Sequence, residues 1–170
     1  LLEAMGIALD QVDTILAIDV PDEIVPEAPY ELVERMRASI VVLGPLLARC
    51  GEARVALPGG DDFGPRPIDL HVRGLQDLGA SFVTSHGFII GRAAQLVGTR
   101  ILLEFPSVGA TENLMCAAVL AKGATVIENA AREPEVTDLA AFLCRMGAQV
   151  IGAGSSTIEI EGVDELGPVD

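Results

Sequence analysis

An internal repeat of about seventy residues is the feature of this sequence that most constrains its fold. The segment Leu2–Gly6 recurs as Leu75–Ala80 and as Leu143–Ala148, and each copy has the apolar spacing of a helix that ends at a glycine. Glycine closes a helix readily because it takes the left-handed conformation that other residues resist. The glycines predicted to do so are Gly6, Gly79 and Gly147.

A stretch of alternating apolar and polar residues, typical of a β-hairpin, follows each of these glycines. In the second copy, Ser81–Thr84 and Phe88–Ile90 flank a short polar turn. In the third copy, Gln149–Ile151 and Thr157–Ile160 flank another. The first copy, Ile7–Ile18, shows the alternation but no obvious tight turn.

A second pattern, a helix that ends at a glycine and leads into a strand, occurs over Ala38–Leu57 and again over Ala110–Glu128. The helices are predicted over Ala38–Cys50 and Ala110–Lys122. The repeating unit is therefore helix, strand, helix and hairpin, present about two and a half times. This pattern predicts an α/β protein with a single pseudosymmetric domain over residues 1–170. The sequence does not contain the opening half of the first unit, so we expect an incomplete domain and a fragment of a longer protein.

The composition narrows the class of protein further. Half of the residues are hydrophobic but only 4% are aromatic, so aliphatic side chains must form the core. The apolar stretches are shorter than the roughly 20 residues that a membrane span needs, and no signal peptide opens the chain. Cys50, Cys116 and Cys144 lack metal-ligand spacing and are predicted to be free thiols. These features predict a cytoplasmic protein with no disulfide and no metal site.

The net charge of −14 argues against a nucleic-acid partner, because such binding depends on cationic side chains that neutralise phosphates. A small anion is still compatible with this charge, since a few converging arginines hold a diphosphate whatever the global balance. We therefore expect small anionic ligands and neither a nucleic acid nor a membrane as partner.

The loop Leu57–His71 contains three glycines and three prolines between positions 58 and 67, a composition that excludes a regular helix or strand there. It is either an ordinary surface connection with solvated aspartates or a ligand-binding loop. The second reading rests on its place between a strand and a helix, where α/β proteins carry their sites. Arg66 stands between two prolines, which restricts the backbone that aims its guanidinium.

Two further loops carry polar residues at helix starts. In Pro106–Glu112, the Ser and Thr side chains are either plain N-caps or part of a phosphate site built from free backbone N–H groups. In Glu128–Glu135, the proline and the last glutamate suit a helix start, whereas Asn129 and Arg132 have no such explanation. His71 has no Ser or Cys partner visible in the sequence and is predicted to be structural.

Taken together, these motifs resemble those of the UDP-N-acetylglucosamine 1-carboxyvinyltransferases, and the resemblance covers nearly the whole chain. The motifs that carry it are Met36–Ser39, Leu57–Gly60, Arg66–His71, Ser107–Thr111 and Asn129–Glu135. The resemblance implies two domains, each an inside-out α/β barrel of repeated βαβαββ units. This chain would supply most of one domain, and the second domain would be absent.

The resemblance also implies a reaction. These enzymes transfer the enolpyruvyl group of phosphoenolpyruvate to the 3-hydroxyl of UDP-N-acetylglucosamine, with release of phosphate. The transfer is the first committed step of peptidoglycan synthesis, and hence serves cell wall biogenesis, cell shape and cell division. No cofactor is implied. The catalytic base and the arginines of the second domain have no counterpart here, so the isolated chain is expected to be inactive.

The resemblance assigns two kinds of site residue. Asp61 occupies the position of the catalytic loop acid, which is usually a cysteine in this family. Because a carboxylate is a poor nucleophile towards the epoxide fosfomycin, this aspartate implies fosfomycin resistance. The residues implied to bind substrate are Arg37, Arg66, Pro67, Ile68, Asp69, Leu70, Phe105, Pro106, Ser107, Val108 and Gly109. Phe105 stands where some members have a basic residue, which removes a charged contact there.

Two alternatives remain open at this point. The chain could be a non-catalytic module that binds uridine nucleotides and never meets a second domain. It could also be a fragment of a 3-phosphoshikimate 1-carboxyvinyltransferase, the sister family that shares the repeated fold but whose substrate contains no uridine.

Overall fold

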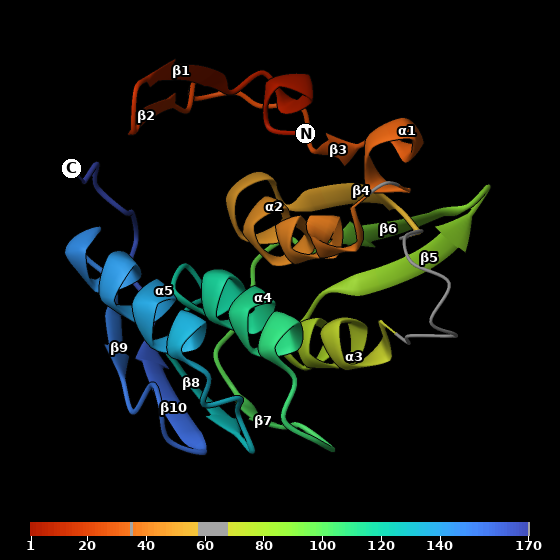
Figure 1. The fold of residues 1–170 in the computed structure, drawn as a ribbon. Helices are drawn as coiled ribbons and strands as arrows, with labels where there is room; N and C mark the ends of the chain where they lie inside the picture. The colour runs from red at the N-terminus through yellow and green to blue at the C-terminus, as the bar shows by residue number, and fades with distance from the viewer. Residues whose placement is uncertain (35, 58–67, 170) are drawn as a thin grey trace.

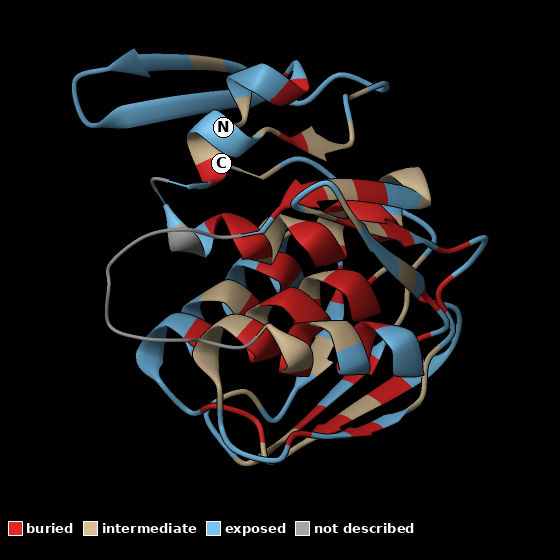
Figure 2. Cartoon of the chain, turned by 90° about the vertical axis from the view of Figure 1, so that its right-hand side faces the viewer, coloured by how far each residue is buried: buried red, intermediate tan, exposed pale blue. Residues whose placement is uncertain are grey.

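The computed structural model describes residues 1–34, 36–57 and 68–169, with the backbone alone at Arg37. The long helices lie between two four-stranded sheets, and a separate two-stranded hairpin covers one end (Figure 1). Buried residues concentrate on the helices in the middle (Figure 2). Helices inside and sheets outside are the arrangement that the expected fold class requires.

The middle repeat forms a sheet in the order β3-β4-β6-β5. Strand β3 runs parallel to β4, and β6 runs antiparallel to both of its neighbours. The elements of this repeat are β3 (Glu27–Ala28), α1 (Tyr30–Val33), the 3-10 helix η2 (Arg37–Val42), α2 (Leu43–Cys50), β4 (Glu52–Ala56), α3 (Asp69–Asp77), β5 (Ser81–Ser85) and β6 (Phe88–Arg92).

The last repeat forms its sheet in the equivalent order, β7-β8-β10-β9, with the same parallel and antiparallel pairings. The equal connectivity confirms the repeat seen in the sequence. Its elements are β7 (Arg100–Leu102), α4 (Val108–Ala118), β8 (Ala124–Glu128), α5 (Pro134–Arg145), β9 (Gln149–Ile151) and β10 (Thr157–Glu161).

The first repeat contributes a short 3-10 helix, η1 (Glu3–Met5), and the hairpin of β1 (Ala8–Val12) and β2 (Ile15–Asp19). The turn that the sequence did not reveal lies at Asp13, whose φ is 54°. In the other two sheets, the second strand of the hairpin also pairs with the strand between the helices. Strand β2 has no such neighbour within the part of the chain that the structure describes.

Helix ends follow the predicted glycines. Gly6, Gly79 and Gly147 have φ values of 88°, 101° and 105°, which confirms their left-handed conformation. Helix bounds differ from the prediction in two places. The segment predicted as a helix over Ala38–Cys50 is a 3-10 helix followed by α2. The helix predicted over Ala110–Lys122 stops at Ala118, since the Lys122 N–H donates to the Leu96 carbonyl 2.8 Å away and leaves the helical path.

Helix α4 packs closely against α2 and α3 because each of those helices presents a glycine to it. A Cβ on Gly44 would lie only 2.2 Å from the backbone oxygen of Asn113, and one on Gly74 would lie 2.6 Å from a Leu114 methyl carbon. The fully buried side chains around these contacts are aliphatic or methionine, as the composition predicted: Leu43, Leu47, Leu75, Leu114 and Met115.

Among the described residues, no helix combines the length and the apolar character that a membrane crossing requires. The same residues contain no group of three or more His, Cys, Asp or Glu side chains placed to hold a metal ion.

Candidate functional site

The start of α3 presents the first candidate residue, Asp69. Its Oδ2 atom forms an ion pair with the Arg73 guanidinium one turn later, at 3.5 Å. Its other oxygen, Oδ1, is buried and has no hydrogen-bond partner among the residues that the structure describes. A buried carboxylate oxygen without a donor is costly, and such atoms commonly mark a place where a ligand or water donates. Asp69 is therefore placed to accept a hydrogen bond from a ligand.

The start of α4 presents the second group of candidates. Ser107 is the N-cap, with an extended backbone, and its Oγ accepts from the Ala110 N–H at 3.4 Å. The Ser107 carbonyl accepts from Thr111, which closes the first turn. The N–H groups of Val108 and Gly109 have no acceptor within the helix, because the first turn has no preceding turn to supply one. Free N–H groups at a helix start bind anions.

An ion-pair network joins these two helix starts. Arg73 contacts Asp69 on its own helix and also Glu104, in the segment between β7 and α4. Neither Arg73 nor Glu104 was predicted from the sequence as a site residue. The four-residue spacing of Asp69 and Arg73 could have revealed their pairing, whereas nothing local marks Glu104. Beside the network lies a small cavity of about 210 Å³, lined by Leu70, Arg73, Gly74, Gln76, Asp77 and Ile101–Glu104.

The structure describes some of the other candidates fully, one by its backbone only, and three not at all. Ile68 precedes α3 and is half-buried, Leu70 is buried, and Phe105 is 53% exposed just before Pro106. Arg37 begins η2, which establishes its backbone position only. The candidates Asp61, Arg66 and Pro67 lie outside the described residues.

A buried polar junction lies behind the site, made by Ile40, Gly44, His71 and Asn113. The Asn113 amide accepts from the Gly44 N–H at 2.6 Å and donates to the Ile40 carbonyl at 3.1 Å. Its nitrogen also lies 2.9 Å from Nδ1 of His71. His71 is 7% exposed and Asn113 is fully buried. We call these four residues the Asn113 junction.

Asn129 has a structural explanation that the sequence did not show. Its φ of 56° places it in the left-handed region, and its Nδ2 donates to the Leu103 carbonyl at 2.9 Å. This bond holds the end of β8 beside the end of β7. For Arg132, the described contact is made by its backbone N–H, which donates to the Glu133 carboxylate.

Comparison with known proteins identifies the family. A family model described as EPSP synthase (3-phosphoshikimate 1-carboxyvinyltransferase) matches residues 1–170. The chain belongs to this family. The structure of the enolpyruvyl transferase NikO from Streptomyces tendae superimposes with a TM-score of 0.81, over 97% of this chain and 40% of that chain. At 22% sequence identity, this likeness establishes the fold alone.

Curated relatives within this enolpyruvyl transferase family carry a more specific name. The UDP-N-acetylglucosamine 1-carboxyvinyltransferase of Corynebacterium jeikeium is 52% identical over 169 residues, which are 99% of this chain and 40% of that protein. The UDP-N-acetylglucosamine 1-carboxyvinyltransferase 1 of Caldanaerobacter subterraneus is 58% identical over 151 residues, which are 89% of this chain and 36% of that protein. The chain thus spans well under half the length of either relative. These transferases are the relatives that the sequence resemblance indicated.

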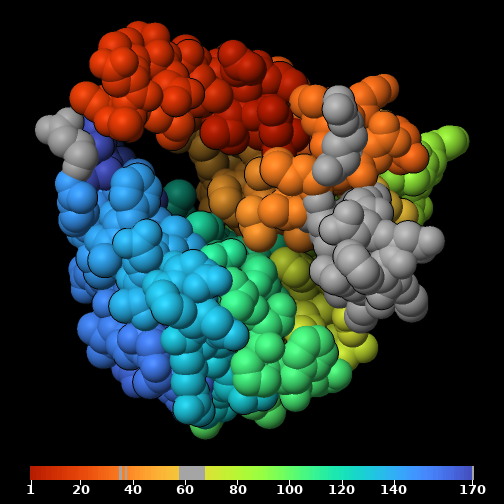
Figure 3. All heavy atoms as spheres, viewed as in Figure 1, coloured from red at the N-terminus to blue at the C-terminus, as the bar shows by residue number. Residues whose placement is uncertain are grey.

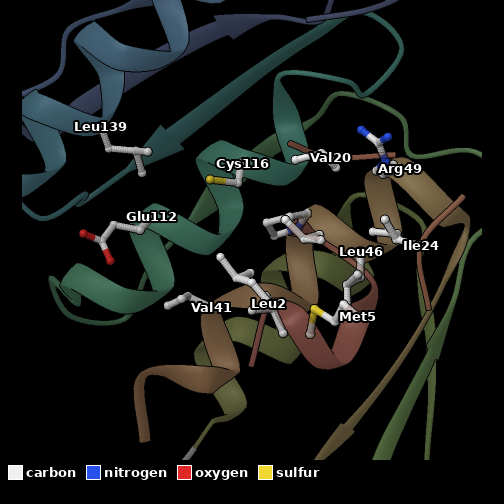
Figure 4. A pocket seen from close by; sticks show the side chains of 13 residues that line it. Leu2, Met5, Val20, Ile24, Val41, Leu46, Arg49, Glu112, Cys116 and Leu139 are labelled. Atoms are coloured by element: carbon white, nitrogen blue, oxygen red, sulfur yellow. The ribbon is translucent and has the colours of Figure 1, made fainter. Parts of the chain in front are cut away.

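A large apolar hollow lies between the N-terminal segment and the helices (Figure 4). Its volume is about 470 Å³. Figure 3 shows the surface hollowed between the N-terminal segment, in red, and the C-terminal part, in blue. The hollow is lined by Leu2, Met5, Ile7, Val20, Ile24, Val41, Val42, Pro45, Leu46, Arg49, Glu112, Cys116 and Leu139.

Burial perturbs the titratable groups on the α4 side of this hollow. The pKa of Glu112 is raised by burial and, to a lesser degree, by the charge of Glu135. Burial, with help from Glu112, raises the pKa of the Cys116 thiol to about 11. In both cases burial beside an apolar space disfavours the charged form.

Proposed function

We propose that this chain supplies part of the sugar-nucleotide site of a UDP-N-acetylglucosamine 1-carboxyvinyltransferase. In this proposal the whole enzyme transfers enolpyruvyl from phosphoenolpyruvate to the sugar 3-hydroxyl, in the cytoplasm, for peptidoglycan synthesis. The observation that carries it is the unpartnered, buried Oδ1 atom of Asp69, joined through Arg73 and Glu104 to the loop before α4. The names of the two curated relatives support the choice of substrate.

Each part of the site has a role in the proposed binding mode. Asp69 accepts the N3–H of uracil, because a carboxylate accepts hydrogen bonds and this one has a free oxygen. The N–H groups of Val108 and Gly109 donate to the diphosphate, together with the Ser107 hydroxyl. Arg37 and Arg66 neutralise phosphate or carboxylate oxygens. Ile68, Leu70, Phe105, Pro106 and Pro67 line the site around these polar groups.

A titration of the 15N-labelled chain with UDP-N-acetylglucosamine tests this assignment. We expect the amide resonances of residues 68–70 and 107–109 to shift, and Asp69→Asn to weaken binding because the amide also presents donors. Each charge-assisted bond is worth roughly 1.5–3 kcal/mol when well formed. Because part of the site would come from outside this chain, we expect weak affinity. Shifts scattered over the surface, with none at these two helix starts, would refute the site.

The description of the family model supports a second candidate, a 3-phosphoshikimate 1-carboxyvinyltransferase. A parallel titration with shikimate 3-phosphate separates the two. Specific shifts with this compound and none with UDP-N-acetylglucosamine would establish the second candidate. Binding of the uridine nucleotide by a full-length protein that releases no phosphate from phosphoenolpyruvate would instead indicate a non-catalytic module.

The domain proposal is that residues 1–170 form one incomplete domain and that a second domain completes the active site. The apolar hollow then accommodates a strand–helix–strand segment equivalent to 27–56 and 100–128, whose last strand pairs with β2. Two features support this occupant: among the described residues β2 pairs with no strand except β1, and η2 and α2 line the hollow with Val41, Val42, Pro45 and Leu46. Phosphate release is expected from the longer protein and not from this chain.

Asp61 is proposed as the loop acid of the transferase. A carboxylate is a far weaker nucleophile than a thiolate, so fosfomycin is expected to leave the protein unmodified. Asp61→Cys in the full-length enzyme should gain a covalent adduct, measured by intact-protein mass spectrometry. An adduct on the Asp61 form would refute this role.

A further inference from the structure

We infer that Asn113 is a positioning residue that sets the three substrate-binding segments of the site relative to one another. The inference rests on the proposed function, which supplies the ligand. Asn113 itself lies beneath the site and is fully buried, so it is not placed to touch substrate.

The three segments converge on one side chain. Ile40 belongs to η2, which begins at the candidate residue Arg37. His71 belongs to α3, which begins at Asp69, and Asn113 belongs to α4, which follows the N-cap Ser107. The Asn113 amide bonds directly to the first two of these elements from the third. A shift of the amide therefore moves or uncouples every described segment that carries a candidate substrate contact.

The partners fix the orientation of this amide. The Gly44 N–H is a donor, so the atom 2.6 Å from it is the amide oxygen. The Ile40 carbonyl is an acceptor, so the atom 3.1 Å from it is the amide nitrogen. The second hydrogen of that nitrogen then points to Nδ1 of His71. Nδ1 must accept this bond, which places the proton of the neutral imidazole on Nε2.

The oriented His71 ring in turn contacts the start of α4, where the candidate anion-binding N–H groups lie. A Cβ built on Gly109 would lie 3.4 Å from Cε1 of His71, so the ring packs against the first turn of α4. The side-chain amide thus orients the imidazole, and the imidazole supports the turn whose N–H groups would bind the diphosphate. A second polar link between α3 and the approach to α4, the Arg73–Glu104 pair, is exposed to solvent. Among the described residues, the Asn113 junction is the buried polar connection between these elements.

The first test needs no substitution. In long-range 1H–15N correlation spectra of the chain at neutral pH, we expect His71 to show the Nε2–H tautomer with a hydrogen-bonded, unprotonated Nδ1. A proton on Nδ1, in either the other tautomer or the imidazolium, would overturn the geometry from which the inference is drawn.

The second test uses Asn113→Leu, which keeps the side chain's size and removes its three hydrogen bonds. We expect the amide resonances of residues 69–71 and 107–110 to move and the Kd for UDP-N-acetylglucosamine to rise about tenfold, the effect typical of losing a group that orients binding residues. His71→Phe is the second variant, because it keeps a ring against Gly109 and leaves the Ile40 and Gly44 bonds in place. It should weaken binding in the same direction and by less.

Thr125→Val is the matched control, because Thr125 is an equally buried polar residue that belongs to β8 and lies outside the Asn113 junction. Its Kd should equal that of the unsubstituted chain. The inference is overturned if a folded Asn113→Leu or His71→Phe variant shows unchanged amide resonances at residues 69–71 and 107–110 and a Kd within about twofold of the control. When the unsubstituted chain binds no UDP-N-acetylglucosamine, the proposed function fails. In that case the His71 tautomer, and the amide shifts at residues 69–71 and 107–110 in the ligand-free variants, test whether Asn113 couples the three segments.

Discussion

The Gly44 N–H donates to Oδ1 of Asn113 at 2.6 Å, and the backbones of α2 and α4 are in contact at the same place. A Cβ on Gly44 would lie 2.2 Å from the Asn113 backbone oxygen and 2.4 Å from Oδ1. Only glycine fits between the two helices, because a backbone carbonyl cannot move aside without moving its helix.

Gly44→Ala should therefore destabilise the chain, although alanine is the better helix former. Overpacking of this kind costs typically 1–3 kcal/mol, and contact with backbone favours the upper end of that range. The measurement is the free energy of unfolding from urea denaturation. Gly74→Ala is the comparison, since its Cβ would meet the flexible methyl groups of Leu114 instead. A cost for Gly44→Ala no greater than that for Gly74→Ala would contradict the close backbone contact.

Two buried threonines make a second, paired prediction. Thr125 and Thr111 are both fully buried. Within the described part of the chain, Oγ1 of Thr125 has no hydrogen-bond partner, whereas Oγ1 of Thr111 accepts from the Ala131 N–H at 3.1 Å. Thr125→Val removes an unpaired polar atom and should leave stability unchanged or raise it by up to about 1 kcal/mol. Thr111→Val leaves the Ala131 N–H without its acceptor and should cost about 1–3 kcal/mol. Equal unfolding midpoints for the two variants would show that the hydroxyls are equivalent.

The repeat, the glycine helix ends and two hairpins could be predicted from the sequence because each is a local pattern. Alternation marks a strand and a glycine after an apolar helix marks its end, within a window of a few residues. The hairpin turn at Asp13 was missed because no glycine or proline marks it. Helix α4 ends earlier than its apolar pattern suggests, since a distant carbonyl, that of Leu96, takes the Lys122 N–H.

The site was predicted less completely. Asp69 came from the family resemblance, whereas Ser107 was indicated both by the helix-start pattern and by the resemblance. Both have a geometry that suits ligand binding. The contacts that organise them join residues far apart in sequence: 69 positions separate Gly44 from Asn113, 42 separate His71 from Asn113, and 31 separate Arg73 from Glu104. No local pattern records such pairs, because each depends on how the helices pack.

Arg73 provides a third prediction, in which stability and binding respond differently. Its side chain is 57% exposed, and ion pairs at such positions contribute about 0–1 kcal/mol. Arg73→Met should therefore leave the free energy of unfolding nearly unchanged. It should nevertheless weaken binding of UDP-N-acetylglucosamine several-fold, because the Asp69 carboxylate and the Glu104 loop lose the cation that holds them together. Calorimetric titration measures the Kd, and Arg100→Met, which removes an ion pair between β7 and β8, is the control. An unchanged Kd for Arg73→Met would remove Arg73 from the binding site.

The cysteines provide the last prediction, which concerns the apolar hollow. Cys116 lines it with a thiol pKa of about 11, raised by burial and by Glu112, and the Cys50 pKa is also raised by burial. Cys144 is exposed on α5. Because the thiolate is the reactive form, roughly one Cys116 thiol in a thousand is ionised at pH 8. Iodoacetamide should therefore modify Cys144 first and Cys116 very slowly, as measured by peptide mass spectrometry over time.

Raising the pH should lower the stability of the chain through the same Cys116 thiol. Folding raises the Cys116 pKa from 9.0 to about 11, so its contribution to stability is complete below pH 9 and is lost as the pH rises towards 11. Cys116→Ala should remove that part of the alkaline loss, and Cys144→Ala is the matched control. If the hollow accommodates the proposed strand–helix–strand segment, a longer protein that contains it should protect Cys116 further while leaving Cys144 as reactive as before. Equal Cys116 reactivity in the short and the long protein would show that no such segment occupies the hollow.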